Sequence, residues 1–144
     1  MITELKSIPD IWKRMPSEMH ARRFLEGIIW STGRHCAHCG SVDSSALRGG
    51  TCRPGLSQCR DCRLQFTVTT RTSMHSTKLD LRLWICAMFL VLTSSKGISS
   101  VVMARLLGVN QRTAWKMGHA IREMMDDRNG ELMPLDGIVE VDEA

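Results

Sequence analysis

The chain has 144 residues, of which 43% are hydrophobic, and a formal net charge of +4. This length accommodates one domain or two compact modules of roughly 50 to 70 residues, and a module that small needs disulfides or a metal for stability. The longest apolar run, residues 83–92, is shorter than the about 20 residues that cross a bilayer. The composition therefore predicts no membrane partner.

Charge is divided unevenly along the chain. Residues 1–125 contain 18 Lys and Arg against 8 Asp and Glu, a net +10, whereas residues 126–144 contain 1 against 7, a net −6. Such a cationic body suits a polyanion. Residues 1–13 carry charges and no apolar segment, so no signal peptide is expected. We expect a cytoplasmic protein in which paired cysteines bind metal and disulfides do not form.

Residues 1–31 are expected to form an N-terminal helical segment. Its helix runs from Ser17 to Ile29, because apolar side chains recur there at three- and four-residue spacing and Ser17 can cap the first turn. Trp30 closes the apolar face of this helix.

Residues 32–72 are predicted to be a zinc ribbon, with short strands near Ser45–Arg48 and Leu64–Val68. The prediction rests on two C-x2-C pairs separated by 19 residues, which supply the ligands Cys36, Cys39, Cys59 and Cys62. Gly40 permits the tight turn after the first pair. Four thiolates leave no open position for water, so the Zn²⁺ is expected to be structural. An iron site would use the same cysteines, and the basic surroundings favour zinc over it.

The other cysteines and the nearby histidines are expected to lie outside this site. His35 and His38 are predicted to be exposed polar residues, because the cysteine set is complete without them. Cys52 is a spectator in the loop between the pairs. Cys86 falls in an apolar helix, where a free thiol behaves as a small buried hydrophobe.

Residues 78–126 are expected to form an all-α helix-turn-helix domain. Residues 79–93 are apolar nearly all round, which is typical of a helix buried on several sides. Helices over residues 99–107 and 111–125 follow, joined by Gly108-Val109-Asn110. Their expected packing positions are Met103, Leu107, Val109, Ala114 and Met117, and we also expect Trp115 and Ile121 to lie in the core.

The second of these helices is the predicted DNA-binding element. A helix in the major groove reads bases from its N-terminal residues, so Gln111 and Arg112 are the base-reading candidates. Lys116 and Arg122 would position the helix on phosphates. Asn110, which caps the helix, and Thr113 complete the predicted contact set. The alternative is a plain helical hairpin whose charged face is solvated.

The order of these segments and their residue motifs resemble those of insertion-sequence transposases that carry an N-terminal zinc ribbon before a DDE-type catalytic domain. The segments that carry the resemblance include Phe24-Leu25-Glu26, Cys36-Ala37-His38-Cys39-Gly40-Ser41, Gln58-Cys59-Arg60-Asp61-Cys62-Arg63, Thr113-Ala114-Trp115, Ile121-Arg122 and Val139-Glu140-Val141-Asp142-Glu143. The resemblance covers nearly the whole chain.

By this resemblance, residues 134–144 are the start of an RNase H-like catalytic domain, of which only the first strand is present. Asp142 matches the first metal-binding carboxylate. The chemistry needs carboxylates from several elements to hold divalent ions such as Mg²⁺. The other ligands are missing from this sequence, so Mg²⁺ is expected only in a full-length relative. The chain by itself is therefore expected not to be an enzyme.

The sequence thus predicts small α+β modules: a four-cysteine zinc ribbon, an all-α helix-turn-helix and the first strand of a truncated RNase H-like domain. The predicted function is binding of double-stranded DNA at an element's terminal inverted repeats. Further expected partners are a second copy or a full-length transposase, with no small-molecule substrate, at a nucleoid-associated location. The alternatives are a stand-alone zinc-ribbon and helix-turn-helix transcription regulator, and a module that binds only proteins.

Overall fold

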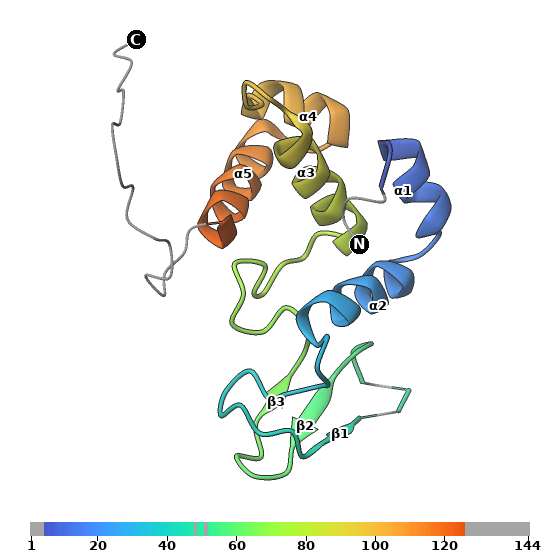
Figure 1. Ribbon diagram of the computed structural model, residues 1–144, viewed down its shortest axis with the longest axis vertical. Helices are drawn as coiled ribbons and strands as arrows, with labels where there is room; N and C mark the ends of the chain where they lie inside the picture. The colour runs from blue at the N-terminus through green and yellow to red at the C-terminus, as the bar shows by residue number, and fades with distance from the viewer. Residues whose placement is uncertain (1–4, 48, 51, 126–144) are drawn as a thin grey trace, which may run out of the picture.

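A computed structural model describes residues 5–47, 49–50 and 52–125 of the chain. A helical part and a small three-stranded ribbon lie at opposite ends of the molecule, and α2 and the connector after β3 lie between them (Figure 1). The elements are α1 (Ile8–Arg14), α2 (Glu18–Ile29), β1 (Ser44–Ala46), β2 (Ser57–Cys59), β3 (Gln65–Phe66), α3 (Leu81–Thr93), α4 (Ser100–Leu107) and α5 (Gln111–Met125).

Two N-terminal helices form where one was expected. Ser7 caps α1 by accepting a hydrogen bond from the Asp10 amide, Pro9 occupies its first turn, and Ile11 is fully buried. The helix α2 begins after Ser17 as predicted, but the Ser17 side chain does not cap it. The Ser17 hydroxyl instead pairs with His20 Nδ1 at 2.8 Å.

The helix α3 is the centre of the helical part. It packs against α1, α2, α4 and α5, which explains why its sequence is apolar nearly all round. Asp80 caps its first turn by accepting from the Arg82 amide at 2.8 Å. Cys86 is fully buried in this helix, as predicted for a small hydrophobe.

The helices α4 and α5 pack closely on each other and on α3. Ser99 caps α4, which ends at Gly108 in the left-handed conformation with a φ of 66°. Asn110 Oδ1 accepts from the Thr113 amide at 3.0 Å and so caps α5. The predicted packing residues are confirmed: Met103, Ala114 and Met117 are buried, and Leu107 and Val109 lie partly buried against the same core.

One core prediction for α5 is right and the other is wrong. Ile121 is buried, whereas the Trp115 side chain is 51% exposed. Ala114 is the buried residue at this point of α5. The next residue along the helix is turned about 100° around the helix axis, away from the buried side. Trp115 therefore lies beside the packed stripe, with its ring 4.2 Å from the His119 ring.

The ribbon is an antiparallel sheet in the order β1-β2-β3. Ser44 pairs with Cys59 and Ala46 with Ser57, while Ser57 also pairs with Phe66 on the other side. Strands were expected near β1 and β3 and are found there in shorter form. The central strand β2 was not expected. Residues 134–144, the predicted catalytic strand, lie outside the described residues.

Candidate metal centre and nucleic-acid interface

The structure brings the four predicted cysteine ligands together. The sulfur atoms of Cys36, Cys39, Cys59 and Cys62 all lie within 4.8 Å of one another. Cys36 Sγ is 3.6 Å from Cys62 Sγ, and Cys39 Sγ is 3.6 Å from Cys59 Sγ. Tetrahedral Zn–S bonds of about 2.3 Å place neighbouring sulfurs about 3.8 Å apart. The four thiols therefore have the spacing that a zinc ion requires.

Two tight turns hold the cysteine pairs. In the first, the Gly40 amide donates to the Cys36 carbonyl at 2.9 Å, and Gly40 has a φ of 77°. In the second, the Cys59 amide donates to the Leu64 carbonyl at 3.1 Å, and Arg63 has a φ of 60°. Arg63 follows its cysteine pair as Gly40 follows the first pair, so both turns use a left-handed residue at the same position. The glycine prediction for Gly40 is confirmed.

The pKa values of the thiols also fit a bound cation. Burial of Cys36 opposes ionisation, but hydrogen bonds from the backbone amides of Cys39 and His38 outweigh it and lower its pKa to about 7. The Leu64 amide favours the thiolate of Cys62, yet burial and the neighbouring thiols together raise its pKa to about 12. Four thiols this close do not all ionise without a counter-charge, and a divalent cation supplies one.

The thiol cluster belongs to a small second core, and one aromatic residue connects this core to the helical one. Cys36, Cys59 and Phe66 form a small buried cluster of their own. The Trp30 ring packs edge-on against Phe66 at 6.0 Å and also contacts the helical core, so it joins the two parts. This extends the predicted role of Trp30, which was to close one helix face.

Cys52, His35 and His38 lie outside the cluster, as expected. All six cysteines are free thiols, with no disulfide among them. His38 is half-buried rather than exposed, and its Nε2 lies 3.3 Å from the Gln65 carbonyl. His35 is also half-buried, with Nδ1 3.3 Å from the Gly33 carbonyl.

The predicted DNA-contact residues lie along α5, at the outer edge of the helical part (Figure 1). Gln111, Arg112, Lys116 and Arg122 are exposed, and Thr113 is half-buried. Gln111 Nε2 donates to the Ser100 hydroxyl at 2.9 Å, which ties the start of α5 to α4. Asn110 is exposed, but its side-chain oxygen is engaged in the helix cap. The arrangement leaves the three cations of α5 able to face a polyanion.

Sequence reasoning did not place Trp115 and His119 on this surface. Both are exposed on α5, where Trp115 lies four residues after Gln111 and His119 four residues later again. The four-residue spacing from Gln111 was the sequence feature that could have placed them there. It was missed because a large aromatic residue on an amphipathic helix is usually a core residue.

The thiol cluster is the one group of three or more metal-ligating side chains in the described part of the chain. Asp142, the predicted first catalytic carboxylate, lies outside that part. No helix among the described residues is both long and apolar enough to span a bilayer.

Within the described residues, the fold and the site define a zinc-ribbon module joined to a bundle of helices. Residues 16–65 match the family model of the transposase zinc-ribbon domain, so this segment is similar to a transposase zinc ribbon. The resemblance to insertion-sequence transposases with an N-terminal zinc ribbon is thereby confirmed for 50 of the 144 residues. The match begins before α2 and ends in β3. No curated protein and no solved structure matches the chain.

Proposed function

We propose that this chain is the DNA-binding N-terminal portion of an insertion-sequence transposase and that it recognises the element's terminal inverted repeats. The observation that carries the proposal is a transposase zinc ribbon followed, in the same chain, by a helical pair with an exposed cationic second helix. The short connection of α4 to α5 through Gly108, Val109 and Asn110 supports the proposal of a helix-turn-helix, in which the second helix enters the major groove.

Each exposed residue of α5 has a different role in this proposal. Arg112 is free of partners among the described residues and lies in the first turn, where side chains reach base edges. Gln111 reads a base only by leaving Ser100, so we expect it to fix the helix pair more than the sequence. Lys116 and Arg122 contact phosphates. Asn110 and Thr113 contribute through their cap hydrogen bond, which fixes the start of α5.

The zinc ion would be structural. Cys36, Cys39, Cys59 and Cys62 would hold it, and four thiolates leave no position for a reacting water. The ion would stabilise the folded ribbon. Phosphoryl transfer needs carboxylates gathered from several elements, and the described residues bring no such group together. We therefore assign binding, and not cleavage or joining of DNA, to this part of a transposase; Asp142 and Mg²⁺ belong to the catalytic part.

Two substitutions on α5 test the proposal. Arg112→Ala should lower affinity for a terminal-repeat duplex about tenfold or more, a loss of roughly 1 to 3 kcal/mol, and bring it toward the affinity for a scrambled duplex. Lys116→Ala should weaken binding to both duplexes alike and reduce the salt slope by about one. Fluorescence anisotropy over a salt series measures both effects.

The matched control is Lys13→Ala, which removes an exposed cation from α1 on the far side of α3. It should bind both duplexes as the unchanged protein does. The proposal fails if Arg112→Ala and Lys116→Ala also bind as the unchanged protein does, because the duplex would then not lie on α5.

A further inference from the structure

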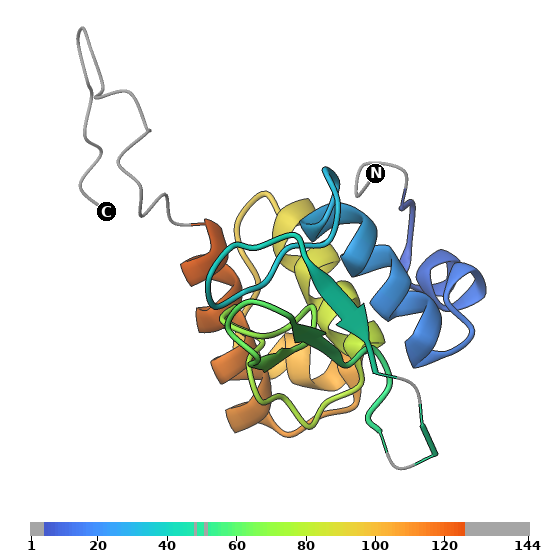
Figure 2. The ribbon, with the colours of Figure 1, turned by 90° about the horizontal axis from the view of Figure 1, so that it is seen from below.

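A polar cavity of about 490 Å³ lies between α2, the ribbon and the connector that follows β3. Figure 2 looks onto the ribbon end of the molecule and shows α2 and α5 on either side of the ribbon. Four separate chain segments border the cavity: the start of α2, His38 in the first cysteine turn, the loop before β2, and residues 65–79. None of the predicted metal ligands or α5 residues lines it.

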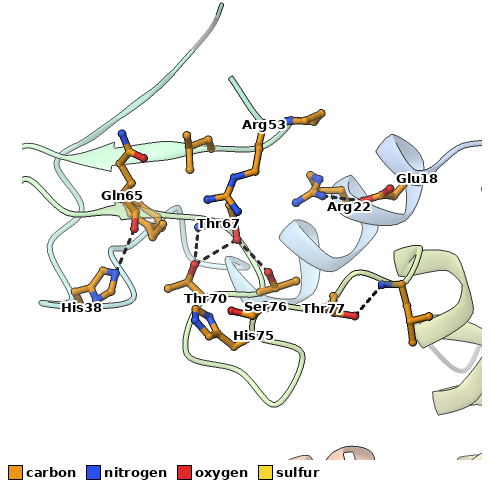
Figure 3. A pocket seen from close by; sticks show the side chains of 15 residues that line it. Glu18, Arg22, His38, Arg53, Gln65, Thr67, Thr70, His75, Ser76 and Thr77 are labelled. Carbon is orange, nitrogen blue, oxygen red and sulfur yellow. Dashed lines mark hydrogen bonds and ion pairs between the residues drawn. The ribbon is translucent and has the colours of Figure 1, made fainter. Parts of the chain in front are cut away.

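Hydrogen-bond donors dominate the walls of this cavity. Figure 3 shows the guanidinium groups of Arg22 and Arg53 directed into the space that Thr67, Thr70 and Ser76 border. The only carboxylate among the lining residues is Glu18. With the histidines neutral, the lining side chains carry a net charge of +1, since two arginines face one glutamate. This chemistry suits an anion rather than a cation or an apolar molecule.

Arg22 supplies the strongest single indication of a ligand. Its side chain is only 13% exposed, and its Nη2 pairs with Glu18 Oε1 at 2.9 Å. Its Nε is buried and, among the described residues, has no hydrogen-bond partner. An unpaired donor on a buried guanidinium costs about 1 to 3 kcal/mol or more, so a shift of the Arg22 side chain that brings an acceptor to Nε would be favourable.

Gly55 makes room for this arginine. A Cβ built on Gly55 would lie 2.5 Å from Arg22 Cδ and 3.2 Å from Arg22 Nε. Gly55 also has a φ of 75°, a conformation that other residues adopt only with strain. The ribbon loop is therefore shaped to let the Arg22 side chain lie flat against its backbone, with Arg53 two residues earlier in the same loop.

The opposite wall is a set of hydroxyl groups on the connector. Thr67 Oγ1 lies 3.0 Å from Thr69 Oγ1 and 3.3 Å from Thr70 Oγ1, and the Thr67 amide donates to Thr70 Oγ1 at 2.9 Å. These bonds fix the rotamers of the threonines at the wall. The side chains of Arg53, His75 and Ser76 make no hydrogen bond or ion pair within the described residues, so their donors remain available.

We infer that this cavity binds one phosphate group of a nucleic-acid backbone. A phosphodiester carries one negative charge, which matches the net charge of the lining, and its oxygens accept from several directions at once, as donors from four segments require. The cavity also adjoins a second hollow. That hollow shares His38, Thr70 and His75 with it and reaches Glu123 near the end of α5.

This inference rests on the proposed function, because it gives the duplex on α5 a second contact beside the ribbon. The zinc ribbon then does more than stabilise the fold: its loop presents Arg53 to the DNA. The phosphate source is either a duplex or the free ion, and the two arms of the test separate them.

The first arm follows the Arg22 Nε–H and Thr70 amide signals by NMR while inorganic phosphate is added to the zinc-loaded chain. The second arm measures anisotropy of a terminal-repeat duplex over a salt series. Arg53→Ala is the main variant because Arg53 is exposed and its loss should leave the fold intact. We expect saturable shifts in the unchanged protein that Arg53→Ala reduces, and a duplex salt slope that Arg53→Ala lowers by about one. Lys13→Ala should change neither.

Gly55→Ala is the second variant, since it displaces Arg22 without removing a charge. It should weaken the phosphate shifts while the zinc content stays that of the unchanged protein. Duplex binding with an unchanged slope in Arg53→Ala would overturn the assignment to DNA, even if phosphate alone saturates the site. Absence of saturable shifts together with an unchanged slope would overturn the cavity as an anion site. Absence of any duplex binding by the unchanged protein would instead overturn the proposed function and, with it, the DNA source.

Discussion

Cys59 and Cys52 lie close in the sequence but have different surroundings in the fold. Cys59 is buried in the thiol cluster, whereas Cys52 is half-buried and outside it. Cys59→Ser should therefore lower the bound zinc from one ion per chain to near zero and unfold the ribbon, because a hydroxyl is a poor zinc ligand. Cys52→Ser should retain the full zinc content. Elemental analysis after gel filtration measures both, and equal zinc loss in the two variants would contradict this ligand set.

Asp80 links the stability of α3 to pH. Hydrogen bonds from Arg82, whose Nη2 lies 2.6 Å from Asp80 Oδ2, hold the pKa of the Asp80 carboxyl below its ordinary value of 3.8. Arg82 also donates to the Pro16 carbonyl at 3.0 Å and lies over the Trp12 ring, so the pair joins α3 to α1 and to the connection between α1 and α2.

The lowered pKa of Asp80 fixes the sign of this dependence. The unfolded chain binds the proton more readily, so the stabilisation is present above pH 3.8 and is lost as the pH falls through the folded-state pKa. Asp80→Asn keeps a capping side chain but loses the charge. Urea unfolding should show the variant less stable near neutral pH and the difference vanishing in acid. Zinc loss at low pH affects both proteins and cancels in the difference between their stabilities. A difference in stability that stays constant with pH would contradict the ion-pair account.

The turn between α4 and α5 sets the packing of the proposed DNA-reading helix. Gly108 has a φ of 66° and no atom within 4 Å of an added Cβ, so Gly108→Ala would be strained by its backbone conformation alone. We expect a loss of about 1 kcal/mol of unfolding free energy.

Gly118 is the matched control on α5. A Cβ there would make ordinary contacts, at 3.6 Å from Arg122 Nη1 and 3.9 Å from Met103 Cε. Gly118→Ala should therefore raise stability by up to about 1 kcal/mol, because alanine favours the helix. Denaturant unfolding compares the pair, and effects of the same sign in both variants would contradict this description of the turn.

The elements that the sequence predicted best are those with a clear apolar period. The helices α3, α4 and α5 fall within two residues of their predicted limits, because each has such a pattern and Asn110 marks the start of the last one. The short helix α1 was missed because its seven residues, Ile8 to Arg14, contain few apolar positions. The strand β2 was missed because Ser57-Gln58-Cys59 has no alternating pattern of its own and pairs through distant partners.

The thiol cluster and the cavity at Arg22 also differ in how far the sequence predicts them. The thiol cluster was predictable because ligand type and spacing are sufficient to define it. The cavity at Arg22 was not predictable, because its residues come from four segments and each one alone resembles an ordinary surface residue. Only the fold places Arg22, Gly55 and Thr67 around one space.

At the scale of the whole molecule, the protein has two cores that share one aromatic residue. The helical core includes α1 to α5, while the ribbon core contains Cys36, Cys59 and Phe66, and Trp30 packs on both. Removal of zinc with a chelator should therefore unfold the ribbon and leave most of the helix content in place. NMR should show collapse of the signals of residues 36–66 with retention of those of α3 to α5. Loss of all structured signals together would show instead that the helices depend on the metal.

The most direct test of the DNA-binding account is the affinity of the zinc-loaded chain for a duplex carrying a transposable element's terminal repeat, compared with a scrambled duplex of equal length. Anisotropy between about 50 and 200 mM salt should show binding to both that weakens steeply with salt, and a preference for the repeat that persists. Equal affinity for the two duplexes, or no binding to either, would contradict the proposal that this chain recognises terminal repeats.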